Sequence, residues 1–280
     1  MANHPPTIDI QNLTYTFADN SVGLEDININ LPAGSRTLLI GANGAGKTTL
    51  LRLASGKKLT TQGRIRIGGV DPFRHGLEGV TYLGLEWVLN PIVRNDIYVH
   101  ELLASVGGDA YPERRDQLVR ILDIDTDWRM HIVSDGERRR VQLAMGLLRP
   151  WSILLLDEVT VDLDVLARFR FLEFLKEETE TRGCTIVYAT HIMDGIAGWP
   201  TNLVRMAAGK VKAVGTVASF LEEAERKGAS VGCGNGGIMR NSALLDLALG
   251  WLAEDLEERG PRDRKKSGQV TYNNVEKEPF

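Results

Sequence analysis

The chain has 280 residues, of which 43% are hydrophobic and 25% charged, the composition of a globular protein with a buried core. It carries 33 Lys and Arg against 37 Asp and Glu, a net charge of −4, so direct nucleic-acid binding through a broad basic surface is not supported. No segment approaches the roughly 18 apolar residues of a membrane span. The first residues lack a signal-peptide pattern, and two cysteines are too few for a disulfide scaffold. We expect a protein with no intrinsic membrane span, located in the cytoplasm or also in the nucleus.

The elements expected along the chain alternate between short apolar runs and amphipathic stretches, which is typical of an α/β domain. The expected strands are Thr7–Phe17, Gly23–Leu31, Arg36–Ile40, Arg64–Ile67, Val80–Leu83, Ile153–Leu156 and Thr185–Ala189. The expected helices are Lys47–Ser55, Asp116–Asp123 and Gly136–Leu148. Because the pattern between about residues 90 and 148 is helical, we expect a helical subdomain inserted there.

The C-terminal part has a different composition. The glycine-rich Gly228–Gly237 indicates a flexible linker, so the main domain is expected to cover residues 1–227 and the linker residues 228–240. A helix is expected over 241–258, because apolar residues recur there at helical spacing. It docks either on its own domain or on a second subunit. Residues 259–280 are polar and charged and are expected to be a disordered tail; the Arg264–Lys266 cluster fits a solvated tail better than a nuclear signal.

A glycine-rich segment lies between the expected strand Arg36–Ile40 and the helix that follows it. It matches the pattern G-x-x-x-x-G-K-[ST], in which glycines allow successive backbone N–H groups and a helix N-terminus to face one anion. The pattern predicts a nucleoside triphosphate site, with Lys47 on the β- and γ-phosphates and the Thr48 hydroxyl beside Mg²⁺. The expected binding residues are Gly41, Ala42, Asn43, Gly44, Ala45, Gly46, Lys47, Thr48 and Thr49.

Two acids directly follow the apolar run Ile153–Leu156. Asp157 is placed to bind Mg²⁺, and Glu158 to hold the attacking water. Carboxylates at the end of a buried strand are costly unless cations lie nearby. Alone, the pair would also fit a turn or a helix N-cap, but beside a phosphate-binding loop we expect the metal and water roles.

The segment Ser134, Asp135, Gly136 and Glu137, followed by three arginines, resembles the signature motif of ABC-type ATPases. The family usually has Leu-Ser-Gly-Gly-Gln, so Asp135 and Glu137 depart from it. The resemblance implies an α/β fold: a RecA-like P-loop core with an antiparallel β part and an inserted helical subdomain, here followed by a C-terminal extension. It also implies ATP as substrate, Mg²⁺ as cofactor and a head-to-tail homodimer, in which Ser134 and Gly136 contact the γ-phosphate bound to the other subunit.

The two departures would place carboxylates beside that phosphate and weaken the closed dimer. Ser134 and Asp135 also fit an ordinary helix N-cap. The N-cap and the signature role are compatible.

Further positions follow in the family's order. Asp162 and Asp164 resemble the loop that couples the two sites across the dimer. His191 resembles the switch histidine that contacts the γ-phosphate and orients the water. With Lys47 and Glu158 it completes the catalytic set that the resemblance implies.

Two other features concern the nucleotide and the metal. Phe17 resembles the aromatic residue that stacks on adenine; Tyr15 has the same strand parity and is the alternative, and both also fit a core. The family usually has a Gln after the strand that corresponds to Val80–Leu83, where it binds Mg²⁺ and senses a membrane subunit. This chain has none, and Glu86 is the alternative metal ligand. The loss of that Gln fits an ATPase that has no membrane subunit.

The variant residues within these motifs resemble a soluble ABC branch, associated in fungi with the carbon-catabolite-repression and Not complex and present in plants as ABC subfamily I. This resemblance implies an ATPase that regulates a soluble protein complex in transcription or mRNA control. The alternatives are an ATP-binding subunit of a transporter, an accessory ATPase for iron–sulfur assembly or translation, and a scaffold that binds ATP without hydrolysing it.

Overall fold

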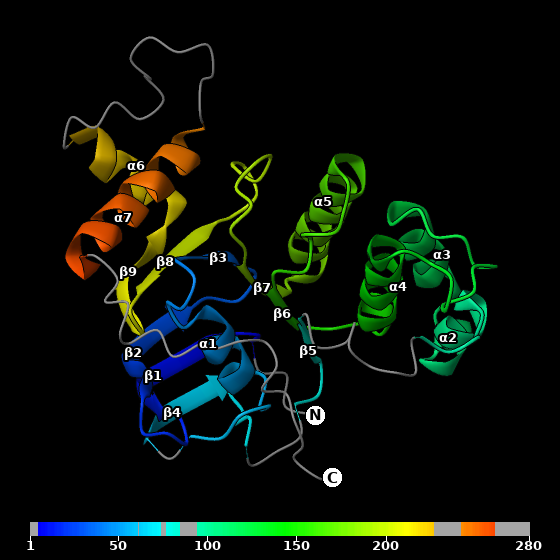
Figure 1. The fold of residues 1–280 in the computed structure, drawn as a ribbon, viewed down its shortest axis with the longest axis horizontal. Coiled ribbons are helices and arrows are strands. Elements are labelled where there is room, and N and C mark those ends of the chain that lie inside the picture. The colour runs from blue at the N-terminus through cyan, green and yellow to red at the C-terminus, as the bar shows by residue number, and fades with distance from the viewer. Residues whose placement is uncertain (1–4, 61, 74–76, 85–93, 227–241, 261–280) are drawn as a thin grey trace.

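The computed structural model describes residues 5–60, 62–73, 77–84, 94–226 and 242–260. The predicted linker at 228–240, the tail from residue 261 onward and Glu86 lie outside these residues, and the division into domains stays a prediction. In chain order (Figure 1) the described elements are β1 (Ile8–Thr16), β2 (Val22–Leu31), β3 (Arg36–Ile40), α1 (Lys47–Ala54), β4 (Gln62–Ile67), β5 (Val80–Leu83), α2 (Val99–Ser105), the 3₁₀ turn η3 (Gly108–Ala110), α3 (Pro112–Ile121), α4 (Asp135–Leu148), β6 (Ile153–Asp157), α5 (Val165–Arg182), β7 (Thr185–Ala189), β8 (Asn202–Ala207), β9 (Lys210–Thr216), α6 (Val217–Arg226) and α7 (Ala243–Arg259).

The central sheet has six strands in the order β5-β6-β7-β3-β8-β9. Neighbouring strands are parallel except for β8 and β9. Every residue of β3, β6 and β7 is buried, as their apolar runs predict for strands covered on both faces. The parallel arrangement brings the carboxyl ends of β3, β6 and β7 to one edge, where ligands of open α/β sheets bind.

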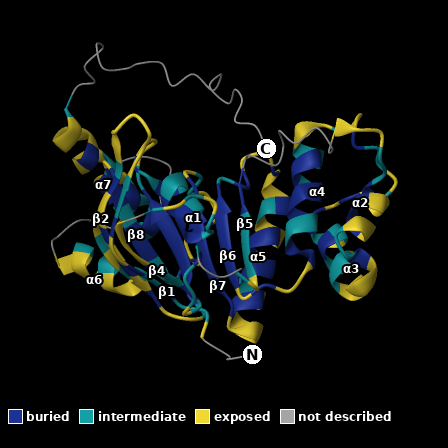
Figure 2. Ribbon diagram, turned by 90° about the horizontal axis from the view of Figure 1, so that it is seen from below, coloured by how far each residue is buried: buried dark blue, intermediate teal, exposed yellow. Residues whose placement is uncertain are grey.

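Alternate residues of the central strands supply two separate cores. On one face, Leu39 and Leu155 pack in a cluster with α1 and with the antiparallel sheet β2-β1-β4. On the other face, Leu38 and Leu154 belong to a cluster that includes residues of α4, α5 and α7. Because alternate residues of a strand point to opposite faces, the central sheet forms the middle of three layers. Figure 2 shows its strands as buried. The mixed α/β class expected from the sequence is confirmed.

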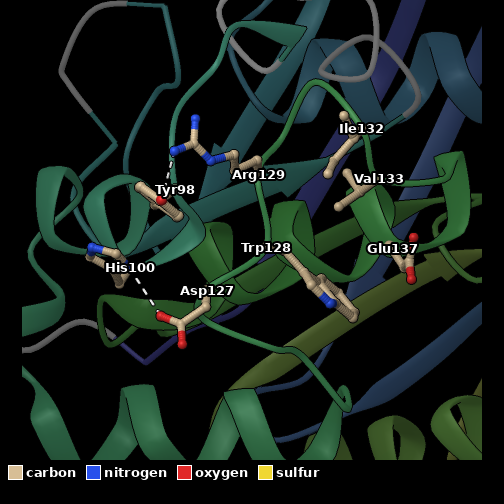
Figure 3. Close-up of a pocket in the computed structure, with 8 residues that line it drawn as sticks. All are labelled: Tyr98, His100, Asp127, Trp128, Arg129, Ile132, Val133 and Glu137. Atoms are coloured by element: carbon tan, nitrogen blue, oxygen red, sulfur yellow. Dashed lines mark hydrogen bonds and ion pairs between the residues drawn. The ribbon is translucent and has the colours of Figure 1, made fainter.

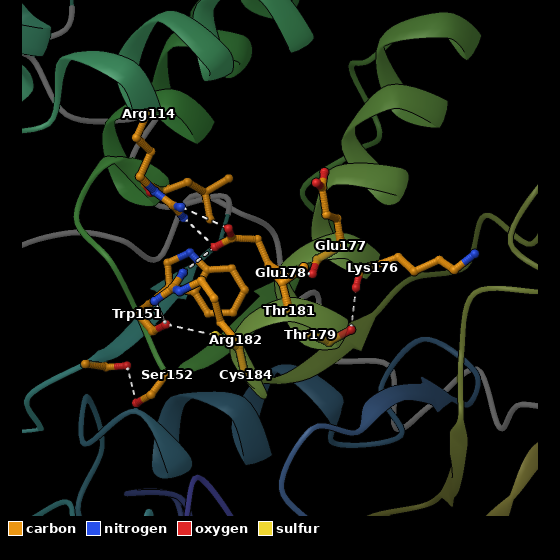
Figure 4. Close-up of polar contacts among 12 residues, drawn as sticks. Arg114, Trp151, Ser152, Lys176, Glu177, Glu178, Thr179, Thr181, Arg182 and Cys184 are labelled. Atoms are coloured by element: carbon orange, nitrogen blue, oxygen red, sulfur yellow. Dashed lines mark hydrogen bonds and ion pairs between the residues drawn. The ribbon is translucent and has the colours of Figure 1, made fainter. Parts of the chain in front are cut away.

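The described part of residues 94–148 is largely helical, and a partly buried ion cluster around the buried Glu178 joins it to α5. Arg114 of α3 donates to both carboxylate oxygens of Glu178, at 3.0 and 2.7 Å, and to the carbonyl of Leu147 at 2.7 Å. Arg182 pairs with the same carboxylate. Figure 4 shows the two guanidinium groups converging on Glu178 beside Trp151. A bidentate pair of this kind fixes orientation, so α3, α4 and α5 hold one arrangement.

Element boundaries differ from expectation at the starts of two helices. The helix expected at Asp116–Asp123 begins earlier, at Pro112, because proline at the first helical position has its φ preset for the helix. The last helix runs over Ala243–Arg259, capped by the hydroxyl of Ser242, which accepts from the Leu245 N–H at 3.2 Å.

Within the described ranges, no helix combines the length and the apolar character required to cross a bilayer.

Candidate functional site

The glycine-rich loop connects β3 to α1 and curls as its pattern predicts. Gly44 and Gly46 have φ values of 86° and 102°, in the left-handed region that favours glycine. Gly46 is the N-cap of α1, and a Cβ there would lie 2.6 Å from Leu24 Cδ2. The loop therefore presents backbone N–H groups at a helix N-terminus, which is an anion-binding arrangement.

The side chain of Lys47 lies inside this loop. Its Nζ donates to the carbonyls of Gly41, at 2.7 Å, and Ala42, at 3.2 Å, and the residue is only 7% exposed. Burial lowers the pKa of Lys47, while the charges of Glu158 and Asp157 oppose the shift. The ammonium is thus held beside two carboxylates, where a phosphate would supply further counter-charge.

Asp157 ends β6 and is held by two hydroxyl groups. Thr48 Oγ1 donates to its Oδ1 at 3.1 Å, and the Tyr82 hydroxyl donates to its Oδ2 at 3.2 Å. Burial raises the pKa of Asp157, and both hydrogen bonds oppose that effect. A buried carboxylate beside a threonine hydroxyl is an oxygen donor set that fits Mg²⁺, which binds through one or two protein groups and the phosphates of its substrate.

Glu158, the next residue, faces His191. Its Oε2 lies 2.9 Å from His191 Nδ1 and accepts from the His191 backbone N–H at 3.3 Å. Glu158 has a φ of 54°, a strained value for a residue with a side chain, and its N–H donates to the carbonyl of Ala189 at the end of β7. The turn out of β6 therefore aims this carboxylate toward the loop after β7.

Phe17 lies just beyond β1, beside the glycine-rich loop. It is 36% exposed and packs edge-on against Tyr15, with ring centroids 5.1 Å apart. Lys58 Nζ lies 5.1 Å from the Tyr15 centroid and 5.3 Å from that of Phe17. Gly23, which contacts the Phe17 ring, also lies against Gly46. Of the two candidates, Phe17 is the more exposed, so it is the one free to offer a ring face.

The segment Ser134–Glu137 forms the start of α4. Ser134 is the N-cap, and its hydroxyl accepts from the Glu137 N–H at 3.2 Å. The Glu137 carboxylate accepts from the Ser134 N–H at 2.7 Å, which completes a capping box. The Ser134 hydroxyl also donates to the Glu137 carboxylate at 2.7 Å, and this hydrogen bond, together with the one from the Ser134 N–H, lowers the pKa of Glu137. Asp135 pairs with Arg138 at 2.6 Å. The position and hydrogen bonds of Ser134 confirm the N-cap interpretation of this segment.

The predicted residues form two groups. Lys47, Thr48, Asp157, Glu158 and His191 meet at the carboxyl edge of the central sheet. The segment 134–137 forms the start of α4, and Asp162 and Asp164 form ion pairs with Arg139 and Arg140 of the same helix. In Figures 1 and 2, α4 lies on the other side of β5 and β6 from α1.

A hollow of about 770 Å³ lies beside the second group, on the helical part (Figure 3). None of the described residues that line it belongs to the phosphate-binding loop. They are Tyr98, His100, Asp127, Trp128, Arg129, Ile132, Val133 and Glu137.

Sequence reasoning did not identify two sets of site residues. Tyr82, which donates to Asp157, lies on a neighbouring strand, where β5 pairs it with Leu155. The sequence signal for Tyr82 is only that a polar group stands near the end of an apolar strand. The second set is Arg139 and Arg140, which contact Asp162 and Asp164; they read in the sequence as part of an arginine-rich helix.

Comparison with known proteins agrees with this geometry. The model of the ABC transporter family matches residues 24–161. CCR4-associated factor 16 of Saccharomyces cerevisiae is 48% identical over 276 residues, covering 89% of this chain and 94% of the yeast protein. ABC transporter I family member 20 of Arabidopsis thaliana is 38% identical, covering 94% of this chain and 81% of the plant protein.

A solved dimeric bacterial ABC transporter cassette, 20% identical, covers 75% of this chain and 98% of its own length with a TM-score of 0.62, and shares the fold. The phosphate-binding loop after β3, the paired acids at the end of β6 and these similarities lead to one assignment: the chain belongs to the ABC ATPase family.

Proposed function

We propose that the protein binds MgATP and hydrolyses it at a head-to-tail homodimer interface, and that closing and opening of this dimer regulates a protein complex. The observation that carries the hydrolysis is the pairing of Glu158 and His191, 2.9 Å apart, one residue after the Asp157 carboxylate that fits Mg²⁺. An ATP-binding scaffold would not require a carboxylate and an imidazole aimed at each other here.

Each residue has a defined task in this proposal. Lys47 and the loop N–H groups bind the phosphates, and Thr48 and Asp157 hold Mg²⁺, which when bound neutralises charge on the transferring phosphoryl group. Glu158 accepts a hydrogen bond from the attacking water, and His191 keeps that carboxylate oriented. Phe17 stacks on the adenine ring.

The segment 134–137 completes the site of the other subunit. The Ser134 hydroxyl and the N–H groups at the start of α4 form a second anion-binding position. The existence of a dimeric cassette with this fold supports the arrangement, and Asp162 and Asp164 lie next to that position.

The test uses the variant Glu158→Gln, which keeps the shape and removes the charge. Turnover is expected to fall at least about tenfold, while ATP binding is retained and light scattering shows an ATP-dependent dimer. Glu173→Gln, an exposed residue of α5, is the matched control and should behave as wild type. Adding Ser134→Arg to Glu158→Gln should prevent the dimer by blocking the partner's phosphate. A monomer at saturating ATP would contradict the head-to-tail arrangement, and normal turnover of Glu158→Gln would displace Glu158.

The biological role is proposed from the yeast relative, whose name associates it with CCR4. We propose a role in transcription or mRNA control, in the cytoplasm or the nucleus. The alternative, an ATP-binding subunit of a transporter, is favoured by the name of the plant relative. Tagged Glu158→Gln protein, recovered with MgATP from gently detergent-solubilised cells, separates the two. A soluble regulatory complex supports the first role, and a near-equal amount of an integral membrane protein supports the second.

A further inference from the structure

After Glu158, the loop between β6 and α5 carries two further acids, Asp162 and Asp164, here called the acid pair. Both contact consecutive arginines of α4 in the same chain. Arg139 Nε lies 3.5 Å from Asp162 Oδ2, and Arg140 Nη2 pairs with Asp164 Oδ2. The acid pair is therefore held within its own subunit by Arg139 and Arg140, which lie in α4 shortly after Ser134.

Arg139 is the more buried of the two arginines, at 2% exposure. Its Nη1 donates to the carbonyl of Gly84, at the end of β5, at 3.2 Å and to Gln142 Oε1. Gln142 Nε2 donates to the same Gly84 carbonyl at 3.0 Å. A buried guanidinium is tolerated only where its donors are satisfied, so α4, the end of β5 and the acid pair are restricted to one relative arrangement.

Arg140 makes a second bridge. Its Nη1 donates to Asp123 Oδ2 at 3.2 Å and to the Leu122 carbonyl at 3.3 Å, just after α3, while Nη2 contacts Asp164. Asp164 is also the N-cap of α5, since its Oδ1 accepts from the N–H groups of Leu166 and Ala167 at 2.9 and 3.0 Å. The Asp164 carboxylate thus caps the start of α5 and also pairs with Arg140 of α4.

Backbone contact adds to these pairs. A Cβ placed on Gly136 would lie 3.0 Å from the carbonyl oxygen of Asp162, so the first turn of α4 lies directly against the loop. Arg139 and Arg140 therefore attach α4 to the loop that follows Glu158, and Gly136 brings the segment 134–137 itself against the same loop.

We propose that Arg139 and Arg140 are positioning residues, which hold the acid pair against α4 so that the segment 134–137 and the loop after Glu158 move as one unit. The consequence for dimer closure rests on the proposed function. Because Asp157 and Glu158 lie immediately before this loop, the unit would report the state of one subunit's hydrolytic residues to the surface that it offers to the other subunit.

The first test needs neither ATP nor a dimer. It compares the hydrogen exchange of backbone amides in Arg140→Gln and Arg149→Gln, where Arg149 lies at the other end of α4 and donates to the Val106 carbonyl instead. In Arg140→Gln, exchange should become about fivefold faster both at Leu166 and Ala167 and at Glu137 and Arg138. The control should match wild type. Faster exchange at the α5 amides alone, or at neither pair, would overturn the proposal.

A second variant guards against misfolding of the first. Asp162→Asn keeps the shape of the side chain and removes the charge that faces Arg139, and it should loosen the same two amide pairs. Protection unchanged at both pairs would show that Asp162 is no part of the unit, which would also overturn the proposal.

The last test separates this proposal from the proposed function. In the Glu158→Gln background with ATP, Arg140→Gln should raise the dimer dissociation constant about tenfold, whereas Arg149→Gln should not. If Glu158→Gln alone stays monomeric, the dimer mechanism is wrong and the exchange data still decide the positioning role. If both double variants dimerise equally well, the coupling to closure is wrong.

Discussion

At the scale of single residues, three unfavourable features lie side by side at the proposed hydrolytic site. Asp157 is buried with a raised pKa, Lys47 is buried with a lowered pKa, and Glu158 adopts a left-handed φ of 54°. Each feature costs stability in isolation. Their concentration on one sheet edge is expected of a site arranged to receive charged ligands.

Tyr82 provides a test at this scale. Tyr82→Phe removes the hydroxyl that donates to Asp157 Oδ2, so the carboxylate loses one of its two orienting groups. The Mg²⁺ concentration that half-saturates MgATP binding should rise about fivefold, equivalent to about 1 kcal/mol, while ATP binding without Mg²⁺ should not change. Fluorescence titration of the two conditions measures this.

Tyr98→Phe is the matched control, because its hydroxyl accepts from Arg129, outside the two predicted groups of site residues. An unchanged Mg²⁺ requirement in Tyr82→Phe would show that Thr48 suffices to orient Asp157.

At the scale of elements, three segments of the proposed site lie at the N-termini of helices. The N-cap of α1 is Gly46, in the phosphate-binding loop, the N-cap of α4 is Ser134, and the N-cap of α5 is Asp164. Each N-cap leaves N–H groups at a helix start that can face an anion or an acid. The residue at each cap therefore decides whether that end binds its own side chain or an external phosphate.

The capping box of α4 predicts a pH dependence. Hydrogen bonds from Ser134 lower the pKa of Glu137 in the folded state below its ordinary value of 4.5. The stabilisation is therefore complete above that ordinary value and is lost as the pH falls through the lowered folded value. Glu137→Gln retains a capping box without titrating.

Thermal unfolding from pH 7 to 3 should show wild type losing stability relative to Glu137→Gln at the acidic end. Parallel curves for the two proteins would mean that the capping box contributes nothing to stability in solution.

At the scale of the whole molecule, α7 returns to the sheet from far along the sequence. Arg205 of β8 donates to Glu254 at 2.6 Å and to Asp255. Trp251 packs edge-on against Phe220 of α6, with centroids 5.0 Å apart, and Lys212 of β9 pairs with Glu258 at 2.7 Å. Of the two docking sites left open by the sequence, the structure shows α7 on its own chain.

The docking of α7 is tested through Trp251, which is 9% exposed. Trp251→Ala should lower the free energy of unfolding by about 3 kcal/mol, because a large buried side chain is removed. Leu256→Ala, on the same helix but 57% exposed, should change it little. Denaturant unfolding measures both, and equal effects would show that α7 is not docked in solution.

How much of this protein could be predicted depended on how local each determinant is. The strands β3, β6 and β7 and the phosphate-binding loop follow from short apolar runs and from glycines at fixed spacing, which are properties of neighbouring residues. The beginning of α3 depends on the proline at its first helical position, Pro112. Asp157 is bound by Tyr82, which lies 75 residues away in the sequence.

By itself, the sequence determined the α/β class, the motif residues and their order, and hence the family, because each rests on spacing within one segment. Only the tertiary structure decided which polar and charged groups meet: Tyr82 with Asp157, Glu158 with His191, and the acid pair with the arginines of α4. The reason is physical, since these contacts form only after parallel strands and helices have packed, and the net gain of each depends on burial and orientation that no single segment specifies.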